Sequence, residues 1–139
     1  MNIAVIGMGK IGLPLAVHYA RKGNKVIGVD INPETVALIN EGIEPFPEEK
    51  NLKEYLQDVV EKGNLNATLK YREAVCDADV VVVVVPLFVT LTGEPDFAAM
   101  DSASEKIGQY LKAGSLICYE TTLPTVSYTH LTLPTKRIV

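Results

Sequence analysis

Three glycines and one aspartate near the N-terminus have the types and spacing to bind a phosphorylated ligand. Gly7, Gly9 and Gly12 follow the spacing G-x-G-x-x-G, and Asp30 lies 18 residues beyond the last of them. A glycine-rich turn that opens a helix presents backbone N–H groups and the positive end of the helix dipole to phosphates. An acid after the next strand accepts hydrogen bonds from ribose hydroxyls and repels a 2′-phosphate. The pattern therefore predicts a dinucleotide site for NAD rather than NADP.

Each glycine of this loop has a predicted task. Gly7 permits the tight turn, Gly9 lets the backbone approach a pyrophosphate, and Gly12 lets the helix and strand pack closely. We expect the whole loop to contribute to the cofactor site, which comprises Gly7, Met8, Gly9, Lys10, Ile11 and Gly12.

The elements that must position these residues alternate between strands and helices. Strands are predicted at residues 2–6, 25–29, 66–70, 79–85 and 115–119, and helices at 10–22, 33–40, 51–62, 72–76 and 97–111. Asn32 is the predicted N-cap of the second helix, with Pro33 at its first position. Residues 86–95 are predicted to form a loop. The alternation predicts a Rossmann-type α/β fold, a doubly wound parallel sheet in the order 3-2-1-4-5, incomplete at the C-terminus.

Composition limits the partners and the compartment. The chain has 139 residues, 47% of them hydrophobic, and a formal net charge of −4, which offers no basic surface for nucleic acid or anionic membranes. The valine run 80–85 is too short to span a bilayer, and no signal peptide precedes the first strand, so we expect a cytoplasmic protein. Cys76 and Cys118 are expected to be free thiols, and His18 lacks partners at metal-ligand spacing, so no metal site is expected.

Beyond the glycines, four segments carry a resemblance to a known family. They are Gly7-Met-Gly-Lys-Ile-Gly-Leu-Pro-Leu-Ala16, the strand end Val29-Asp30, the run Ala78-Asp-Val-Val-Val-Val-Val-Val-Pro86, and Glu120-Thr-Thr-Leu-Pro124. Over residues 1–125 the chain resembles the N-terminal NAD-binding domain of the UDP-glucose/GDP-mannose dehydrogenase family. The resemblance implies oxidation of the C6 alcohol of a nucleotide sugar to a carboxylate, with two NAD per turnover and a cysteine thiohemiacetal and thioester.

The resemblance also implies roles for particular residues. Val85 and Pro86 would lie against the NAD, and Thr122 would adjoin the cofactor and help to position the catalytic water. Thr122 has an alternative role as a strand-end residue that caps its own backbone. Glu120 and the segment Leu-Pro-Leu-Ala favour a UDP-N-acetylhexosamine over UDP-glucose as the substrate in polysaccharide biosynthesis.

Two departures from the family pattern affect these expectations. Leu87-Phe88-Val89-Thr90 replaces the usual Thr-Pro, and Thr35 stands where a basic residue often helps to hold the adenosine. We therefore expect the loop 86–95 to contact NAD differently. The resemblance implies that the full-length protein is a homodimer or a larger oligomer.

The last 14 residues, 126–139, depart abruptly from the family pattern. Codons for Val126 to Thr135 can be written to match the reverse complement of a transposase-library sequencing adapter, which continues through an index to a stop codon. We therefore expect a native domain over residues 1–125 and a non-native tail over 126–139. The family's Gly-Gly-x-Cys nucleophile segment is not in this sequence, so the fragment alone is expected to be inactive.

Two other functions fit the fingerprint. An NAD-dependent dehydrogenase of the 3-hydroxyacyl or phosphogluconate type shares it but should lack the Thr-Thr-Leu-Pro segment. A stand-alone NAD-binding domain that senses the cofactor would need a native stop codon near residue 125.

Overall fold

The centre of the molecule is a parallel five-stranded sheet. A computed structural model describes residues 1–47 and 49–121. The sheet has the order β3-β2-β1-β4-β7, which confirms the predicted order 3-2-1-4-5 because β7 is the fifth strand of this sheet. The strands are β1 (Asn2–Ile6), β2 (Lys25–Val29), β3 (Leu65–Thr68), β4 (Val80–Val83) and β7 (Leu116–Tyr119).

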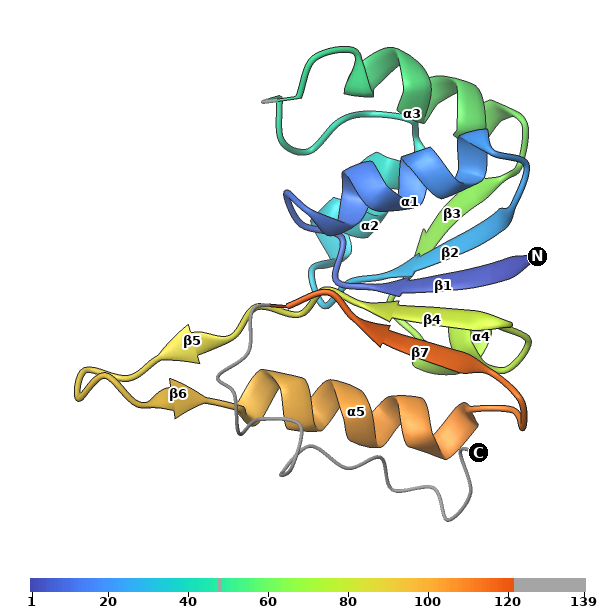
Figure 1. The fold of residues 1–139 in the computed structure, drawn as a ribbon. Coiled ribbons are helices and arrows are strands. Elements are labelled where there is room, and N and C mark those ends of the chain that lie inside the picture. The colour runs from blue at the N-terminus through green and yellow to red at the C-terminus, as the bar shows by residue number, and fades with distance from the viewer. Residues whose placement is uncertain (48, 122–139) are drawn as a thin grey trace.

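Helices cover both faces of the sheet (Figure 1). On one face lie α1 (Gly12–Arg21), α2 (Pro33–Asn40) and α3 (Leu52–Glu61), and on the other lie α4 (Tyr71–Val75) and α5 (Ala98–Tyr110). Each helix begins and ends within two residues of its predicted bounds. The fold is therefore the expected doubly wound α/β arrangement.

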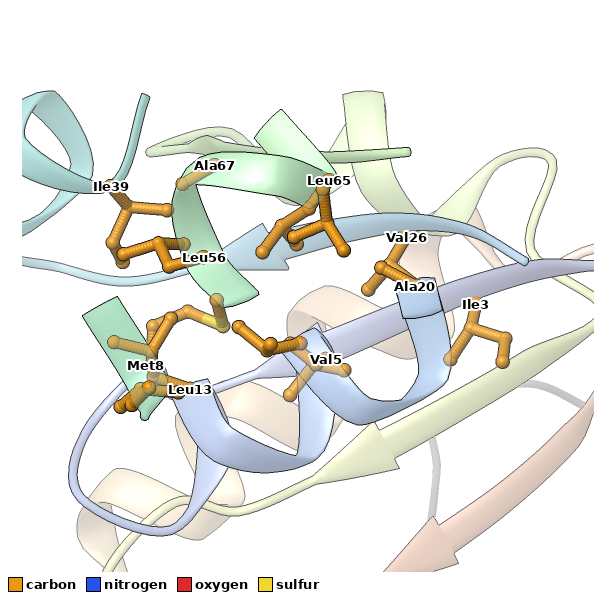
Figure 2. Close-up of a cluster of buried hydrophobic side chains, with 14 of the residues drawn as sticks. Ile3, Val5, Met8, Leu13, Ala20, Val26, Ile39, Leu56, Leu65 and Ala67 are labelled. Carbon is orange, nitrogen blue, oxygen red and sulfur yellow. The ribbon is translucent and has the colours of Figure 1, made fainter. Parts of the chain in front are cut away.

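The two faces of the sheet build two hydrophobic cores. In β1, Ile3 and Val5 join the core under α1 to α3, whereas Ala4 and Ile6 join the core under α4 and α5. Figure 2 shows the first of these cores. The valine strand β4 is 3% exposed or less at residues 81–83 and contributes to both cores, which confirms that it is a central strand.

Helix α2 has a predicted cap and an unpredicted contact. The Asn32 side chain accepts hydrogen bonds from the N–H groups of Glu34 and Thr35, at 2.9 and 3.5 Å, which confirms it as the N-cap. At the other end, the Asn40 amide donates to the Ala67 carbonyl at 2.9 Å and accepts from the Ala67 N–H at 2.7 Å. Asn40 thus satisfies backbone groups of β3 at the edge of the sheet, where no neighbouring strand can do so among the described residues.

The segment 86–95 is not wholly a loop, and that prediction was wrong for its paired residues. The strand β5 (Phe88–Val89) pairs antiparallel with β6 (Pro95–Asp96). Gly93 makes the turn with a φ of +82°, and the Thr90 N–H donates to the Glu94 carbonyl at 2.8 Å. The hairpin projects from the carboxyl edge of the sheet (Figure 1).

Several expectations concern thiols, membranes and the C-terminus. Cys76 and Cys118 are free and partly buried, as predicted. Within residues 1–47 and 49–121, no helix has the length and apolar character needed to cross a bilayer. Thr122 and the proposed tail 126–139 lie outside the described residues.

Candidate dinucleotide-binding site

Asp30 joins the two segments that follow β1 and β2. Its Oδ2 accepts a hydrogen bond from the Met8 N–H at 2.9 Å, and its Oδ1 accepts one from the Asn32 N–H at 2.9 Å. The carboxylate is therefore fixed between the glycine-rich loop and the start of α2. Since each carboxylate oxygen has two lone pairs, both can still accept a hydrogen bond from a ribose hydroxyl.

Gly7 and Gly12 are required by the fold of the loop. Gly7 has a φ of +97°, and its N–H donates to the Val29 carbonyl at 2.8 Å. A Cβ at Gly7 would lie 2.9 Å from the Val84 carbonyl oxygen, and a Cβ at Gly12 would collide with the Gly7 carbonyl. Both positions exclude a side chain because backbone occupies the space that it would need.

Gly9 differs from the other two glycines of the loop. No atom lies within 4 Å of the place where its Cβ would be, so the protein itself does not need a glycine there. The next helix, α1, starts after Ile11 without a side-chain cap. The open space at Gly9 and the uncapped helix start beside it leave room for a phosphate group, which helix N-termini can bind.

Met8 has its side chain in the hydrophobic core rather than toward this open space. It is fully buried and packs in the cluster that includes Leu13 and Leu56 (Figure 2). A Cβ at Gly28 on β2 would collide with the Met8 side chain, so Gly28 provides the space that Met8 fills. Met8 is therefore a packing residue whose N–H also orients Asp30.

A pocket of about 450 Å³ opens over the carboxyl ends of β1, β2 and β4. Five of the predicted site residues line it: Gly7, Gly9, Asp30, Val85 and Pro86. The remaining residues of the loop do not line it, although Lys10 lines a smaller hollow beside Gly9. The structure thus brings the glycine turn, the acid and the end of the valine strand to one cavity at the carboxyl edge of the sheet, where ligands of open α/β sheets bind.

Tyr71 and Lys106 also line the pocket, and sequence reasoning missed both. Tyr71 is the first residue of α4, and Lys106 is on α5 with its Nζ 5.3 Å from the centre of the Tyr71 ring. Burial raises the pKa of the Tyr71 hydroxyl, and the negative charge of Asp30 raises this pKa further. The two residues are 35 positions apart in the chain, and neither belongs to a motif that would indicate a binding role.

The end of β7 adjoins the same pocket. The Glu120 N–H donates to the Val83 carbonyl, and the Thr121 hydroxyl donates to the Val85 carbonyl, both at 2.9 Å. Thr121 therefore ties the chain that follows β7 to the pocket wall, a contact that the sequence did not indicate. Thr122 is the next residue, and its predicted role stays a prediction.

The site fits a dinucleotide in both shape and donor set. The open space at Gly9 and α1 suits the diphosphate, Asp30 suits a ribose, and Val85 and Pro86 supply apolar walls for rings. Among the described residues, no group of three or more His, Cys, Asp or Glu side chains could hold a metal ion.

The parallel sheet, the glycine turn and the acid after β2 define a dinucleotide-binding domain of the Rossmann type. The chain belongs to the UDP-glucose/GDP-mannose dehydrogenase family, whose NAD binding domain model matches residues 1–137. NAD is therefore the cofactor of this domain, as predicted.

Individual relatives agree with this membership. The UDP-N-acetyl-D-mannosamine dehydrogenase of Yersinia pestis is 38% identical over 127 residues, covering 88% of this chain and 28% of the relative. The UDP-N-acetyl-D-glucosamine 6-dehydrogenase of Pseudomonas aeruginosa is 32% identical, with the same coverage. A crystal structure of GDP-mannose dehydrogenase from Pseudomonas aeruginosa superposes with a TM-score of 0.86 at 26% identity, covering 93% of this chain and 30% of that one. The chain thus spans less than a third of the length of these relatives.

Proposed function

We propose that this chain is the NAD-binding part of an enzyme that oxidises the C6 alcohol of a nucleotide sugar to a carboxylate. The main support for this proposal is that the glycine turn, Asp30 and the end of β4 all surround one pocket. NAD supplies the hydride acceptor for each of the two oxidation steps. Overall, the alcohol, one water and two NAD⁺ give the carboxylate, two NADH and three protons.

The role of this chain's own residues is to bind and orient the cofactor. Asp30 holds the adenosine ribose, the N–H groups at Gly9 and α1 hold the diphosphate, and Val85 and Pro86 contact the cofactor at the end of β4. Thr122 positions the water that attacks the oxidised carbon. The hydrogen bond from Thr121 to Val85 supports this placement, because it holds the preceding residue beside the pocket.

The proposed substrate is a UDP-N-acetylhexosamine rather than UDP-glucose. Glu120 and the segment Leu13-Pro-Leu-Ala16 support this preference, and the relatives from Yersinia and Pseudomonas carry N-acetylhexosamine substrates in their names. We further propose a homo-oligomeric, cytoplasmic enzyme.

We propose that residues 126–139 are a translated adapter and that the native domain continues after residue 125. The family model matches residues 1–137, a range that includes most of this proposed tail. The proposal is therefore tested on the DNA sequence. Sequencing the source locus across codon 125 should show a frame that continues to a Gly-Gly-x-Cys segment. A genomic stop after Val139 would contradict this proposal and favour a stand-alone NAD-binding protein.

The activity is tested on the protein encoded by the complete locus. NADH formation is followed with UDP-N-acetylglucosamine, UDP-N-acetylmannosamine and UDP-glucose. We expect two NADH per sugar and a higher kcat/KM for one of the acetylated sugars. No NADH with any nucleotide sugar would contradict the function, and a preference for UDP-glucose would contradict the substrate. The 139-residue chain is the control and should form no NADH.

A further inference from the structure

One end of the pocket is built by the helices on the far face of the sheet. Beyond Asp30, the pocket wall includes Tyr71 from α4, and Ala99, Ser102 and Lys106 from α5. The two helices share a hydrophobic core through Ala74, Val75, Ala103 and Ile107. The shared core fixes their separation, so the side chains that they present to the pocket have a defined spacing.

Tyr71 and Lys106 form a cation–π pair at this end. The Lys106 Nζ lies 5.3 Å from the Tyr71 ring centre, within the range of about 6 Å for this interaction. Tyr71 is partly buried, and Asp30 is close enough for its charge to act on the hydroxyl. The pocket therefore combines a carboxylate, an aromatic ring and an ammonium group at one end.

This combination matches an adenosine. The inference rests on the proposed function, in which Asp30 binds the ribose of the adenosine half of NAD. The base is bonded directly to that ribose, so it must lie against the wall next to Asp30. Adenine has a π face that can contact an aromatic ring and ring nitrogens that accept hydrogen bonds.

We propose that Tyr71 and Lys106 bind the adenine of NAD. The Tyr71 ring contacts the base, and the Lys106 ammonium donates a hydrogen bond to a ring nitrogen. Both residues thus favour NAD through its adenosine half and leave the nicotinamide half to the other end of the pocket.

The test is calorimetric titration of the 139-residue chain with NAD and with ADP-ribose, which lacks nicotinamide. Tyr71→Leu and Lys106→Met should each weaken the binding of both ligands by about tenfold, as expected for loss of a base contact. Tyr71→Phe keeps the ring and should stay within about twofold of the unsubstituted chain. Lys53→Met is the matched control, because Lys53 is exposed on α3 on the opposite face.

The outcomes separate the two levels of the proposal. One outcome is that the unsubstituted chain binds NAD, and that Tyr71→Leu and Lys106→Met keep its melting temperature and bind NAD as tightly as it does. The adenine assignment is then overturned while the proposed function stands. A loss for NAD that is not seen for ADP-ribose would also overturn it, because the contact would then be with nicotinamide. No NAD binding by the unsubstituted chain would overturn both.

Discussion

The carboxylate of Asp30 accepts a hydrogen bond of 2.9 Å from the backbone N–H of Met8. This bond connects the acid after β2 to the glycine-rich loop after β1, so two segments far apart in the chain hold each other in place. A ribose bound by Asp30 and a diphosphate bound by the loop would therefore have a fixed separation. The acid acts in the architecture of the site as well as in the proposed recognition of the ribose.

Asp30→Asn should lower the free energy of unfolding by about 1 to 3 kcal/mol. The substitution turns one acceptor oxygen into an NH₂ group, which cannot accept from Met8 or Asn32. Urea unfolding at pH 7 measures the change. Asp58→Asn is the control, since the Asp58 pair with Lys62 is exposed and should contribute little. Equal stability of the two variants would contradict the proposed linkage.

Gly12→Ala and Gly9→Ala should have opposite kinds of effect. A Cβ at Gly12 collides with backbone, so this variant should lose about 3 kcal/mol or more, or fail to fold. A Cβ at Gly9 meets no atom of the protein, so this variant should melt like the unsubstituted chain and bind NAD at least about tenfold more weakly. Thermal melting and calorimetry separate the two effects. A stable Gly9→Ala variant with full NAD affinity would contradict the assignment of Gly9 to the diphosphate.

Gly28→Ala should destabilise the chain by about 1 to 3 kcal/mol, because the new Cβ meets the Met8 side chain. Met8→Ala should cost about 2 to 5 kcal/mol through the cavity it leaves. The double variant should lose less than the sum of the two, since the truncated residue 8 makes room for the methyl group. Urea unfolding of the unsubstituted chain, the two single variants and the double variant measures the coupling energy in this double-mutant cycle. Strict additivity would show that the two residues do not share this space.

Asp79 should make stability depend on pH on the acid side. The Asn2 N–H donates to the Asp79 carboxylate at 2.8 Å, and the Lys112 ammonium donates to it at 2.9 Å. These two hydrogen bonds hold the pKa of the Asp79 carboxyl below its usual range. The pKa of Asp79 is lower in the folded protein than in the unfolded chain, so its carboxylate stabilises the fold fully above pH about 4. This stabilisation is lost as the pH falls through the folded pKa. The stability difference between the unsubstituted chain and Asp79→Asn should therefore shrink below pH 4 in urea unfolding. A difference that is constant from pH 6 to pH 3 would contradict this account.

Much of the fold could be predicted because local signals agreed with the tertiary arrangement. The run of valines in β4 can only be a strand buried on both faces, and Asn32-Pro33 starts a helix through its own cap. The hairpin was missed because β5 and β6 have two residues each, and Pro95 weakens the strand pattern.

The candidate site was predictable where its residues belong to recognisable sequence motifs. The glycine spacing and Asp30 indicate their roles directly. In contrast, Tyr71 and Lys106 meet through the packing of α4 on α5, and Gly28 matters only because Met8 fills the space above it. Such relationships depend on tertiary contacts between distant residues, which no local pattern encodes.

If Asp30 makes this domain selective for NAD, calorimetric titrations with NAD and with NADP will show the difference. With the unsubstituted 139-residue chain, NAD should bind at least about tenfold more tightly than NADP, because the Asp30 charge repels the 2′-phosphate. In Asp30→Asn the preference should fall toward equality. Tighter binding of NADP than of NAD by the unsubstituted chain would show that Asp30 does not select NAD.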